Sequence, residues 1–427
     1  MRDVVIVSGR RTAIGAYGGS LKDTPVVDLG AEVLKGALLA AGVRPVTGEE
    51  SSRCAADSIR DDGRLELEQK YAVYPSDLQP IEIDQVIMGN VLSAGQGQNV
   101  ARQAMIRAGV PKETSATTVN KLCASGLEAV ALASQAIRCG DSEVILAGGM
   151  ESMSRVPYAL PNARWGQRMG DGQMLDLLIY DGLFETFYGY HMGMTAENIA
   201  ARYGISRQEQ DELGALSHNR AMAAIGGQIF AEEIVPVAIP QRKGEPLLFA
   251  VDERPMETSA EKMGRLRPAF KKDGTVTAGN ASGINDAAAA LLVMSADKAA
   301  ELGLQPLVKI KAHSTAGLDP AYMGLGPIPA VRKLLAKHRL KIGNFDSIEL
   351  NEAFAVQAIA CMRELGCDIE KTNVLGSGIS LGHPIGCTGA RILLTLMQQM
   401  KRKNQELGLA SLCIGGGQGM AMVLENC

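Results

Sequence analysis

The sequence is poor in features that mark several broad classes of protein. Aromatic residues make up only 4% of the 427 residues, and acidic residues outnumber basic ones by only 47 to 43, so we expect no basic surface for nucleic acid. No apolar run approaches the roughly 20 residues that a membrane-spanning helix needs. We therefore predict neither a nucleic-acid partner nor a membrane partner.

Cysteine pairs at metal-binding or redox spacing are also missing. The eight cysteines are scattered along the chain without a C-x-x-C pair, and the five histidines do not cluster with them. This distribution argues against a disulfide framework and predicts no metal site. The start of the chain runs directly into the apolar stretch Val4–Val7 and lacks a secretory leader pattern. We therefore expect a cytoplasmic protein with reduced thiols.

Short β-rich runs alternate with helical patterns from residue 3 onward. Val4–Ser8 and Glu143–Ala147 are typical of strands, whereas Val100–Ala108 is typical of a helix. The second half repeats this order, with predicted strands at Ser347–Leu350 and Asn373–Leu375. The pattern predicts an α/β sheet with helices on its faces, built from two copies of a βαβαβ-type unit.

Composition shifts suggest a division of the chain. We predict an N-terminal half over residues 1–153, completed by residues 284–305, and a C-terminal half over residues 306–427. Between them, residues 154–283 break the alternation and predict an inserted loop domain over the carboxyl ends of the strands. Residues 44–80 are polar and acidic, which is typical of a surface loop or a short helical excursion.

Cys123 lies between a predicted strand, Thr117–Val119, and a helix that Ser125 opens. This elbow places the thiol near a helix N-terminus, which favours negative charge and is expected to lower the pKa of Cys123 toward a usable thiolate. That setting suits a nucleophile. A small buried hydrophobic cysteine is the other interpretation, and this stretch alone does not separate the two.

Three further stretches carry candidate chemistry. His383 lies on a tight Gly-His-Pro turn, where it is either a general base for Cys123 or a structural histidine. Asn351 follows a predicted strand, where its amide holds a water or an oxyanion, or caps a helix. Cys413 ends a strand before three glycines, starting at Gly415, whose N–H groups suit an oxyanion hole. Cys413 itself is an acid/base or a buried strand cysteine.

Taken together, these stretches resemble the motifs of the thiolase family, in the order seen there. The resemblance extends over essentially the whole chain and is strongest toward the biosynthetic thiolases. The stretch Tyr190–Gly193 is the motif that distinguishes this subgroup. The motifs that carry it are Asn120–Gly126, Ala278–Asp286, Asn351–Ala355, Gly382–Arg391 and Cys413–Gly417.

The resemblance implies a thiolase fold, in which two pseudo-repeated halves form a layered α/β sandwich with an inserted loop domain. It implies an acetyl-CoA C-acetyltransferase activity: Claisen condensation of two acetyl-CoA molecules to acetoacetyl-CoA and CoA, and the reverse thiolysis. Coenzyme A thioesters are then the substrates, and no separate cofactor is expected. A homotetramer or homodimer is expected, with residues 155–193 as the tetramer contact.

The resemblance also implies roles for the candidate residues. Cys123 becomes acetylated while His383 takes its proton, and Cys413 then removes an α-proton from a second acetyl-CoA. A water held by Asn351, together with His383, stabilises the thioester oxygen of that second substrate. The backbone N–H groups of Cys123 and Gly415 hold the oxygen of the acyl-cysteine.

The same resemblance implies a set of mostly apolar residues around the substrate. Phe354 is expected to wall the acyl pocket. The residues expected to line the pantetheine and acyl end of the coenzyme A site are Leu183, His191, Met192, Phe270, Ala278, Ser282 and Met323.

Three other functions remain as alternatives. A degradative 3-ketoacyl-CoA thiolase would use the same residues around a wider pocket. A non-catalytic acyl-CoA-binding subunit would keep the fold, but it has no need of Cys413 over its acyl group. A ketosynthase-type condensing enzyme uses a Cys-His-His or Cys-His-Asn set, and the second cysteine, Cys413, argues against it.

Overall fold

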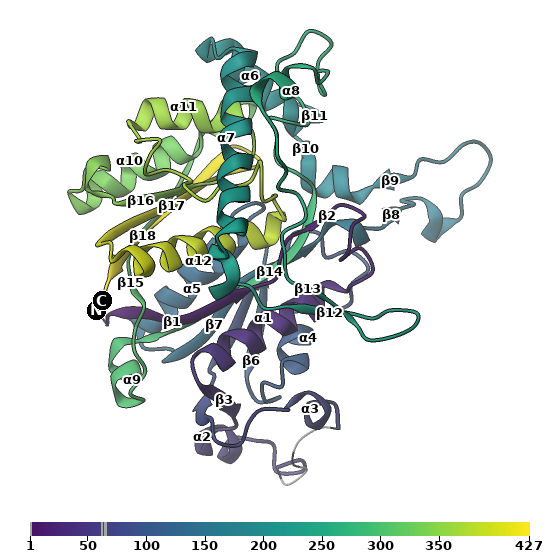
Figure 1. Cartoon of the computed structure of the whole chain (residues 1–427). Coiled ribbons are helices and arrows are strands. Elements are labelled where there is room, and N and C mark those ends of the chain that lie inside the picture. The colour runs from purple at the N-terminus through teal and green to yellow at the C-terminus, as the bar shows by residue number, and fades with distance from the viewer. Residues whose placement is uncertain (1, 61–62, 64–65) are drawn as a thin grey trace.

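The computed structural model describes residues 2–60, 63 and 66–427, and its centre is one mixed β-sheet (Figure 1). Its strands are β1 (Val4–Arg11), β2 (Gly15–Ala16), β5 (Gln85–Gly89), β6 (Ser115–Val119), β7 (Val144–Ser152), β14 (Asn285–Ser295), β15 (Val308–Gly317), β16 (Ser347–Leu350), β17 (Leu407–Ile414) and β18 (Gln418–Asn426). Neighbours follow the order β16-β17-β18-β15-β1-β14-β7-β5-β6, and β2 pairs with β14.

The two halves of this sheet repeat the same pairing pattern. In the first half β5 and β7 are parallel, and β7, β14 and β1 are then antiparallel in turn. In the second half β16 and β17 are parallel, and β17, β18 and β15 are then antiparallel in turn. The halves meet where β1 and β15 pair. The predicted α/β fold with two pseudo-repeated halves is therefore confirmed.

The predicted strand at Asn373–Leu375 is wrong. Only a single parallel bridge, between Ile348 and Thr372, occupies the position that β6 holds in the first half. Asn373 has a φ of 51°, outside the extended region. Its side-chain amide instead accepts from the N–H of Leu350 at 2.8 Å and donates to the carbonyl of Leu350 at 2.7 Å. The side chain of Asn373 thus extends to Leu350 the pairing that backbone atoms make at Ile348.

Strand β7 is longer than predicted. The sequence suggested an end at Ala147, before Gly148 and Gly149, but the strand continues to Ser152 because residues 148–152 pair with residues 286–290 of β14. The extension carries Glu151 into the interior, where its side chain is fully buried.

Helices cover both faces of the sheet. On the N-terminal half, α1 (Val26–Ala40) and α4 (Val100–Arg107) pack on the outer face, and on the C-terminal half α10 (Pro327–His338) and α11 (Ala355–Leu365) do so (Figure 1). The core between the halves combines α5 (Ser125–Cys139) and α12 (Ile385–Lys403) with strands from both halves. The apolar run in β1 follows from this layering, because alternate side chains enter two different cores.

Helices α5 and α12 approach each other backbone to backbone at their first turns. A Cβ atom at Gly126 would lie 2.8 Å from the backbone nitrogen of Ala390. A Cβ atom at Gly149, on the adjacent β7, would lie 2.1 Å from the carbonyl oxygen of Gly386. Only glycine permits this spacing. The approach brings the elbows that carry Cys123 and His383 to the same region of the fold.

The chain between β7 and β14 is largely irregular. A projecting excursion carries the short strands β8 (Tyr158–Ala159) and β9 (Leu175–Asp176), and β10 (Phe184–Glu185) pairs with β11 (Tyr190–His191) (Figure 1). The remaining α-helices and β-strands of this stretch are α6 (Met192–Tyr203), α7 (Arg207–Gly226), β12 (Val237–Ile239), β13 (Leu247–Phe249) and α8 (Ala260–Gly264), and α9 (Ala296–Glu301) follows β14.

The polar stretch 44–80 forms a short helical excursion, which matches one of the two predicted forms. It contains α2 (Glu49–Arg53) and α3 (Glu66–Tyr71), and it is bounded by the paired strands β3 (Val43–Val46) and β4 (Gln79–Glu82). Residues 61–62 and 64–65 of this stretch lie outside the described residues. Among the residues that the structure describes, no helix has the length and apolar character to cross a bilayer.

Candidate active site

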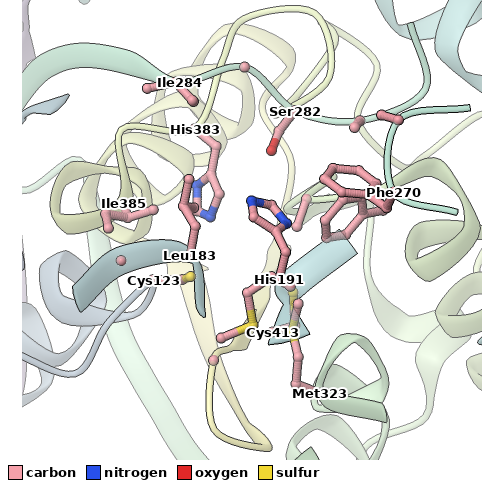
Figure 2. A pocket seen from close by; sticks show the side chains of 18 of the residues that line it. Cys123, Leu183, His191, Phe270, Ser282, Ile284, Met323, His383, Ile385 and Cys413 are labelled. Carbon is pink, nitrogen blue, oxygen red and sulfur yellow. The ribbon is translucent and has the colours of Figure 1, made fainter. Parts of the chain in front are cut away.

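A cavity of about 290 Å³ opens where the two elbows meet the irregular chain before β14. All of the predicted site residues line it except Asn351. The complete lining is Leu122, Cys123, Met153, Gly182, Leu183, His191, Met192, Ala269, Phe270, Thr277, Ala278, Ala281, Ser282, Gly283, Ile284, Met323, Ala353, Phe354, His383, Ile385, Cys413 and Gly415. Figure 2 shows Cys123 and His383 toward one side of the cavity and the rings of His191 and Phe270 toward the other.

The elbow that carries Cys123 is held by side chains of its own motif. Leu122 has a φ of 49°, and its N–H donates to the side-chain oxygen of Asn120 at 3.0 Å. The hydroxyl of Ser125 donates to the carbonyl of Leu122 at 2.7 Å and accepts from the N–H of Lys121 at 2.9 Å. Asn120 and Ser125 therefore fix the turn that presents Cys123 to the cavity.

The expected lowering of the Cys123 pKa is wrong. Burial raises the pKa of this thiol to about 11, although the N–H groups of Gly415 and Cys123 oppose the rise. The negative charge of Glu151 adds to it. Desolvation of the thiolate outweighs the helix N-terminus here. Cys123 is therefore a thiol at neutral pH, and a neighbouring base is needed to remove its proton.

His383 has the geometry of such a base. Its Nδ1 atom lies 2.7 Å from Oγ1 of Thr388, and that hydroxyl donates to the carbonyl of Pro384 at 2.9 Å. The Thr388 hydroxyl proton is thus already used, so Nδ1–H of His383 donates to Oγ1 and Nε2 keeps its lone pair. Nε2 has no hydrogen-bond partner among the described residues. Burial, assisted by Arg391, lowers the pKa of His383 to about 3, so the ring is neutral.

Cys413 occupies the end of β17, buried beside the cavity. Burial raises the pKa of its thiol well above the ordinary value, and the neighbouring Cys123 raises it further. The chain then turns through Gly415–Gly417, where Gly416 and Gly417 have φ values of 73° and 79°. The N–H of Gly415 contacts the Cys123 sulfur, which places one oxyanion donor beside the nucleophile.

Asn351 is fully buried and lies behind the cavity. Its Nδ2 atom is 3.5 Å from Nδ1 of His383, and its Oδ1 atom has no partner among the described residues. The backbone N–H of Asn351 donates to the carbonyl of Ser411 at 3.0 Å. Asn351 therefore contacts the His383 ring but does not itself line the cavity.

Aromatic rings form one wall of the cavity. His191 and Phe270 are stacked with their ring centroids 4.7 Å apart, and Phe270 meets Phe354 edge to face at 6.2 Å. Nδ1 of His191 accepts from the N–H of Gly193 at 3.0 Å, which caps the start of α6. A Cβ atom at Gly193 would lie 2.2 Å from the Phe270 ring, so glycine is needed for this stack.

Sequence reasoning missed part of the lining. Most of the missed residues are apolar neighbours of predicted ones, such as Leu122 and Ile385, and they carry no chemical signal of their own. Basic residues flank Phe270 in the sequence, although none of them lines the cavity. The exposed basic residues on either side of it are Arg265, Arg267, Lys271 and Lys272. Among the described residues, no group of three or more histidine, cysteine or acidic side chains is arranged to hold a metal ion.

Comparison with known proteins agrees with this geometry. The model of the thiolase N-terminal domain matches residues 4–52 and 65–297, and that of the thiolase C-terminal domain matches residues 304–426. The unmatched residues 53–64 lie within the helical excursion. The chain is 50% identical, over the full length of both proteins, to acetyl-CoA acetyltransferases of Pseudomonas aeruginosa PAO1 and Escherichia coli K12.

Solved structures show the same likeness. The acetyl-CoA acetyltransferase of Bacillus anthracis superimposes with a TM-score of 0.89 at 42% identity, covering 100% of this chain and 99% of that one. Human mitochondrial 3-ketoacyl-CoA thiolase superimposes with a TM-score of 0.88 at 38% identity and the same coverage. With both domain models matched in order along the chain, this protein belongs to the thiolase family.

Proposed function

We propose that this protein is an acetyl-CoA acetyltransferase, which condenses two acetyl-CoA molecules to acetoacetyl-CoA and CoA and catalyses the reverse thiolysis. The observation that carries the proposal is the meeting of two cysteine sulfurs and one neutral imidazole at a single cavity. The identity of 50% to relatives of that name over the full chain supports it.

In the first half-reaction, the Cys123 sulfur attacks the acetyl carbonyl while Nε2 of His383 takes the thiol proton. The carbon–sulfur bond to coenzyme A breaks, and the departing thiolate takes the proton of Cys413. The N–H groups of Gly415 and Cys123 stabilise the oxyanion that forms on the way. The raised pKa of Cys123 is the reason that His383 is required.

In the second half-reaction, the Cys413 thiolate removes an α-proton from another acetyl-CoA. A thiol whose pKa is raised by burial is a strong base once it is ionised, which suits this weakly acidic proton. The resulting enolate attacks the acetyl group on Cys123, and the Cys123 thiolate leaves and recovers its proton from His383. His383 and a water bound by Asn351 stabilise the enolate oxygen, and the unpartnered Oδ1 of Asn351 supports that role.

The lining suits the remainder of the substrate. The apolar and aromatic wall formed by Phe270, Phe354 and Met323 fits the acyl group and the pantetheine chain. The exposed side chains of Lys271 and Lys272 follow Phe270 directly and suit the phosphates of coenzyme A. The proposed chemistry uses side chains and N–H groups of this chain together with one water, so we propose that it needs no resident cofactor.

A degradative 3-ketoacyl-CoA thiolase is the second candidate, favoured by the likeness to the human mitochondrial enzyme of that name. The two functions differ in the acyl chain that is accepted. The test is thiolysis of acetoacetyl-CoA, 3-ketohexanoyl-CoA and 3-ketodecanoyl-CoA, with Cys123→Ser as the control. Activity on the four-carbon substrate alone, lost in Cys123→Ser, is the expected result. Comparable rates on longer chains would favour the degradative enzyme, and no activity on any would favour a binding subunit.

We further propose that the protein is a cytoplasmic homodimer or homotetramer. The projecting excursion between β7 and α6 supports self-association, because it exposes apolar side chains that a partner copy would cover. The most exposed of these are Tyr158, Leu160, Trp165, Met169, Met174 and Phe187. Light scattering of the intact protein, with Trp165→Ser as the variant, tests this. A smaller assembly in the variant is expected, and a monomeric wild type would reject the proposal.

A further inference from the structure

Glu151 is a fully buried carboxylate that the proposed mechanism does not use. Its Oε1 atom accepts from Nδ2 of Asn90 at 2.9 Å and from the N–H of Leu92 at 3.2 Å. Its Oε2 atom accepts from the N–H of Val91 at 3.1 Å and from the N–H of Gly386 at 2.9 Å. Both oxygens are therefore occupied by donors, which suits the ionised carboxylate.

These donors belong to two segments that border the cavity from different parts of the chain. Residues 90–92 follow β5 and contact the Cys123 elbow, because the N–H of Asn90 donates to the carbonyl of Val119 at 3.0 Å. Val91 and Leu92 also share an apolar cluster with Ile385, against which Leu122 and Cys123 pack. Gly386 belongs to the first turn of α12, three residues after His383.

The fit around the carboxylate is tight. A Cβ atom at Gly386 would lie 2.6 Å from Oε2 of Glu151 and 2.9 Å from the carbonyl oxygen of Met150. The first turn of α12 therefore cannot approach or rotate without disturbing the carboxylate. Burial raises the pKa of Glu151 to about 7, and the N–H donors of Val91, Leu92 and Gly386 oppose that rise. A buried carboxylate is costly to keep, and here hydrogen bonds to backbone offset that cost.

We propose that Glu151 is a positioning residue that fixes the first turn of α12 against residues 90–92 and thereby holds His383 in register with Cys123. Glu151 does not line the cavity and contacts neither catalytic side chain by hydrogen bond, so it acts through the backbone. The inference rests on the proposed function, in which His383 takes the proton of Cys123.

Two variants test it from opposite sides of the contact. Glu151→Gln replaces an acceptor oxygen by an amide that faces N–H donors, and Gly386→Ala keeps the charge but pushes the helix turn away. Asp84→Asn is the matched control, because Asp84 accepts from the N–H groups of Glu143 and Val144 at the other end of β7. We measure kcat and KM for acetoacetyl-CoA thiolysis, and the rate at which iodoacetamide alkylates Cys123 without substrate.

Both test variants are expected to lower kcat at least tenfold, because small displacements of a base are costly, while KM stays within twofold. Cys123 alkylation is expected to slow in both, and Asp84→Asn is expected to match the wild type in all three quantities. The alkylation readout needs no turnover, so it tests Glu151 even if the wild type fails as a thiolase and the proposed function falls.

Several outcomes would overturn the proposal. One is faster alkylation in Glu151→Gln, since loss of the negative charge beside Cys123 favours the thiolate and would show that charge, rather than position, matters. Another is a raised KM with unchanged kcat, which would indicate a substrate-binding role. If kcat falls only in proportion to the fraction of folded protein, as measured by circular dichroism, Glu151 has a structural role instead. Gly386→Ala keeps the proposal testable if Glu151→Gln fails to fold.

Discussion

The Nδ1 atom of His383 lies 2.7 Å from Oγ1 of Thr388, and this contact leaves Nε2 as the free acceptor of the imidazole. The contact is local, since both residues belong to the turn that opens α12. The tautomer of the proposed base is therefore set by a hydroxyl within its own motif rather than by a carboxylate.

Removal of that hydroxyl should impair the base. Thr388→Val deletes the acceptor of Nδ1–H, so both tautomers become accessible and Nε2 is no longer held as the acceptor. We expect kcat for thiolysis to fall at least about tenfold with little change in KM. Thr395→Val is the control, because Thr395 is equally buried two turns further along α12, where it contacts Glu233. Equal losses in the two variants would contradict the assignment.

The two proposed half-reactions should separate in a Cys413 variant. In Cys413→Ala the α-proton has no base, so condensation and thiolysis should fall by about a hundredfold or more. Acetylation of Cys123 should continue more slowly, because solvent can protonate the departing thiolate. Mass spectrometry of the intact protein after incubation with acetyl-CoA measures the acetyl adduct. Cys387→Ala, which alters another buried cysteine outside the cavity, should accumulate no adduct beyond wild-type levels.

Stability should depend on pH through His383. Its pKa is about 3 in the folded protein, below the 6.5 of an unfolded chain, so only the unfolded state gains a proton as the pH falls. This linkage stabilises the fold above pH 6.5 and is lost progressively toward pH 3. Between pH 7.5 and 5, the wild type should lose about 2 kcal/mol of unfolding free energy relative to His383→Asn. Urea titrations of both proteins at the two pH values measure this difference, and equal losses would refute it.

The aromatic wall should depend on Gly193. A Cβ atom there would overlap the Phe270 ring, so Gly193→Ala should displace the stack of Phe270 on His191. We expect KM for acetoacetyl-CoA to rise at least about threefold, because the wall is proposed to contact the substrate and not the reacting sulfur. Gly226→Ala is the control, because Gly226 also lies in a helix but has open space around its Cβ position. An unchanged KM in Gly193→Ala would show that the aromatic wall takes no part in substrate binding.

The fold could be predicted where one local signal decided the structure. The strand Ser347–Leu350 is bounded as predicted, because its polar and apolar residues alternate and the polar pair Asn351-Glu352 follows it. Asn373 shows the opposite case. Its side-chain amide makes the two hydrogen bonds to Leu350 that a neighbouring strand would make, and the sequence does not reveal that Leu350 lies opposite it. The length of β7 was missed for a similar reason. Its glycines suggested a turn, whereas the partner strand β14 keeps them extended.

Some features of the site could likewise be predicted from the sequence, and others could not. Motif order was enough to name the residues that gather at the cavity, including Cys123, His383 and Cys413. The motif did not reveal the direction of the Cys123 pKa, because a helix N-terminus is visible in sequence and desolvation is not. Thr388 and Glu151 were missed because their importance depends on which atoms they meet, and a lone threonine or glutamate carries no signal.

Gly126 of α5 and Gly149 of β7 let main-chain atoms of α12 approach closely, which brings the elbows of Cys123 and His383 together. The opposite wall of the cavity, by contrast, is formed by side chains from several separate segments, among them His191, Phe270 and Phe354. The position of the proposed catalytic residues thus depends on close backbone contacts, whereas the proposed substrate wall depends on side chains. A designer who wants a longer acyl group to be accepted should rebuild the wall and leave the elbows alone, because a side chain added at either glycine would misalign the chemistry for every substrate.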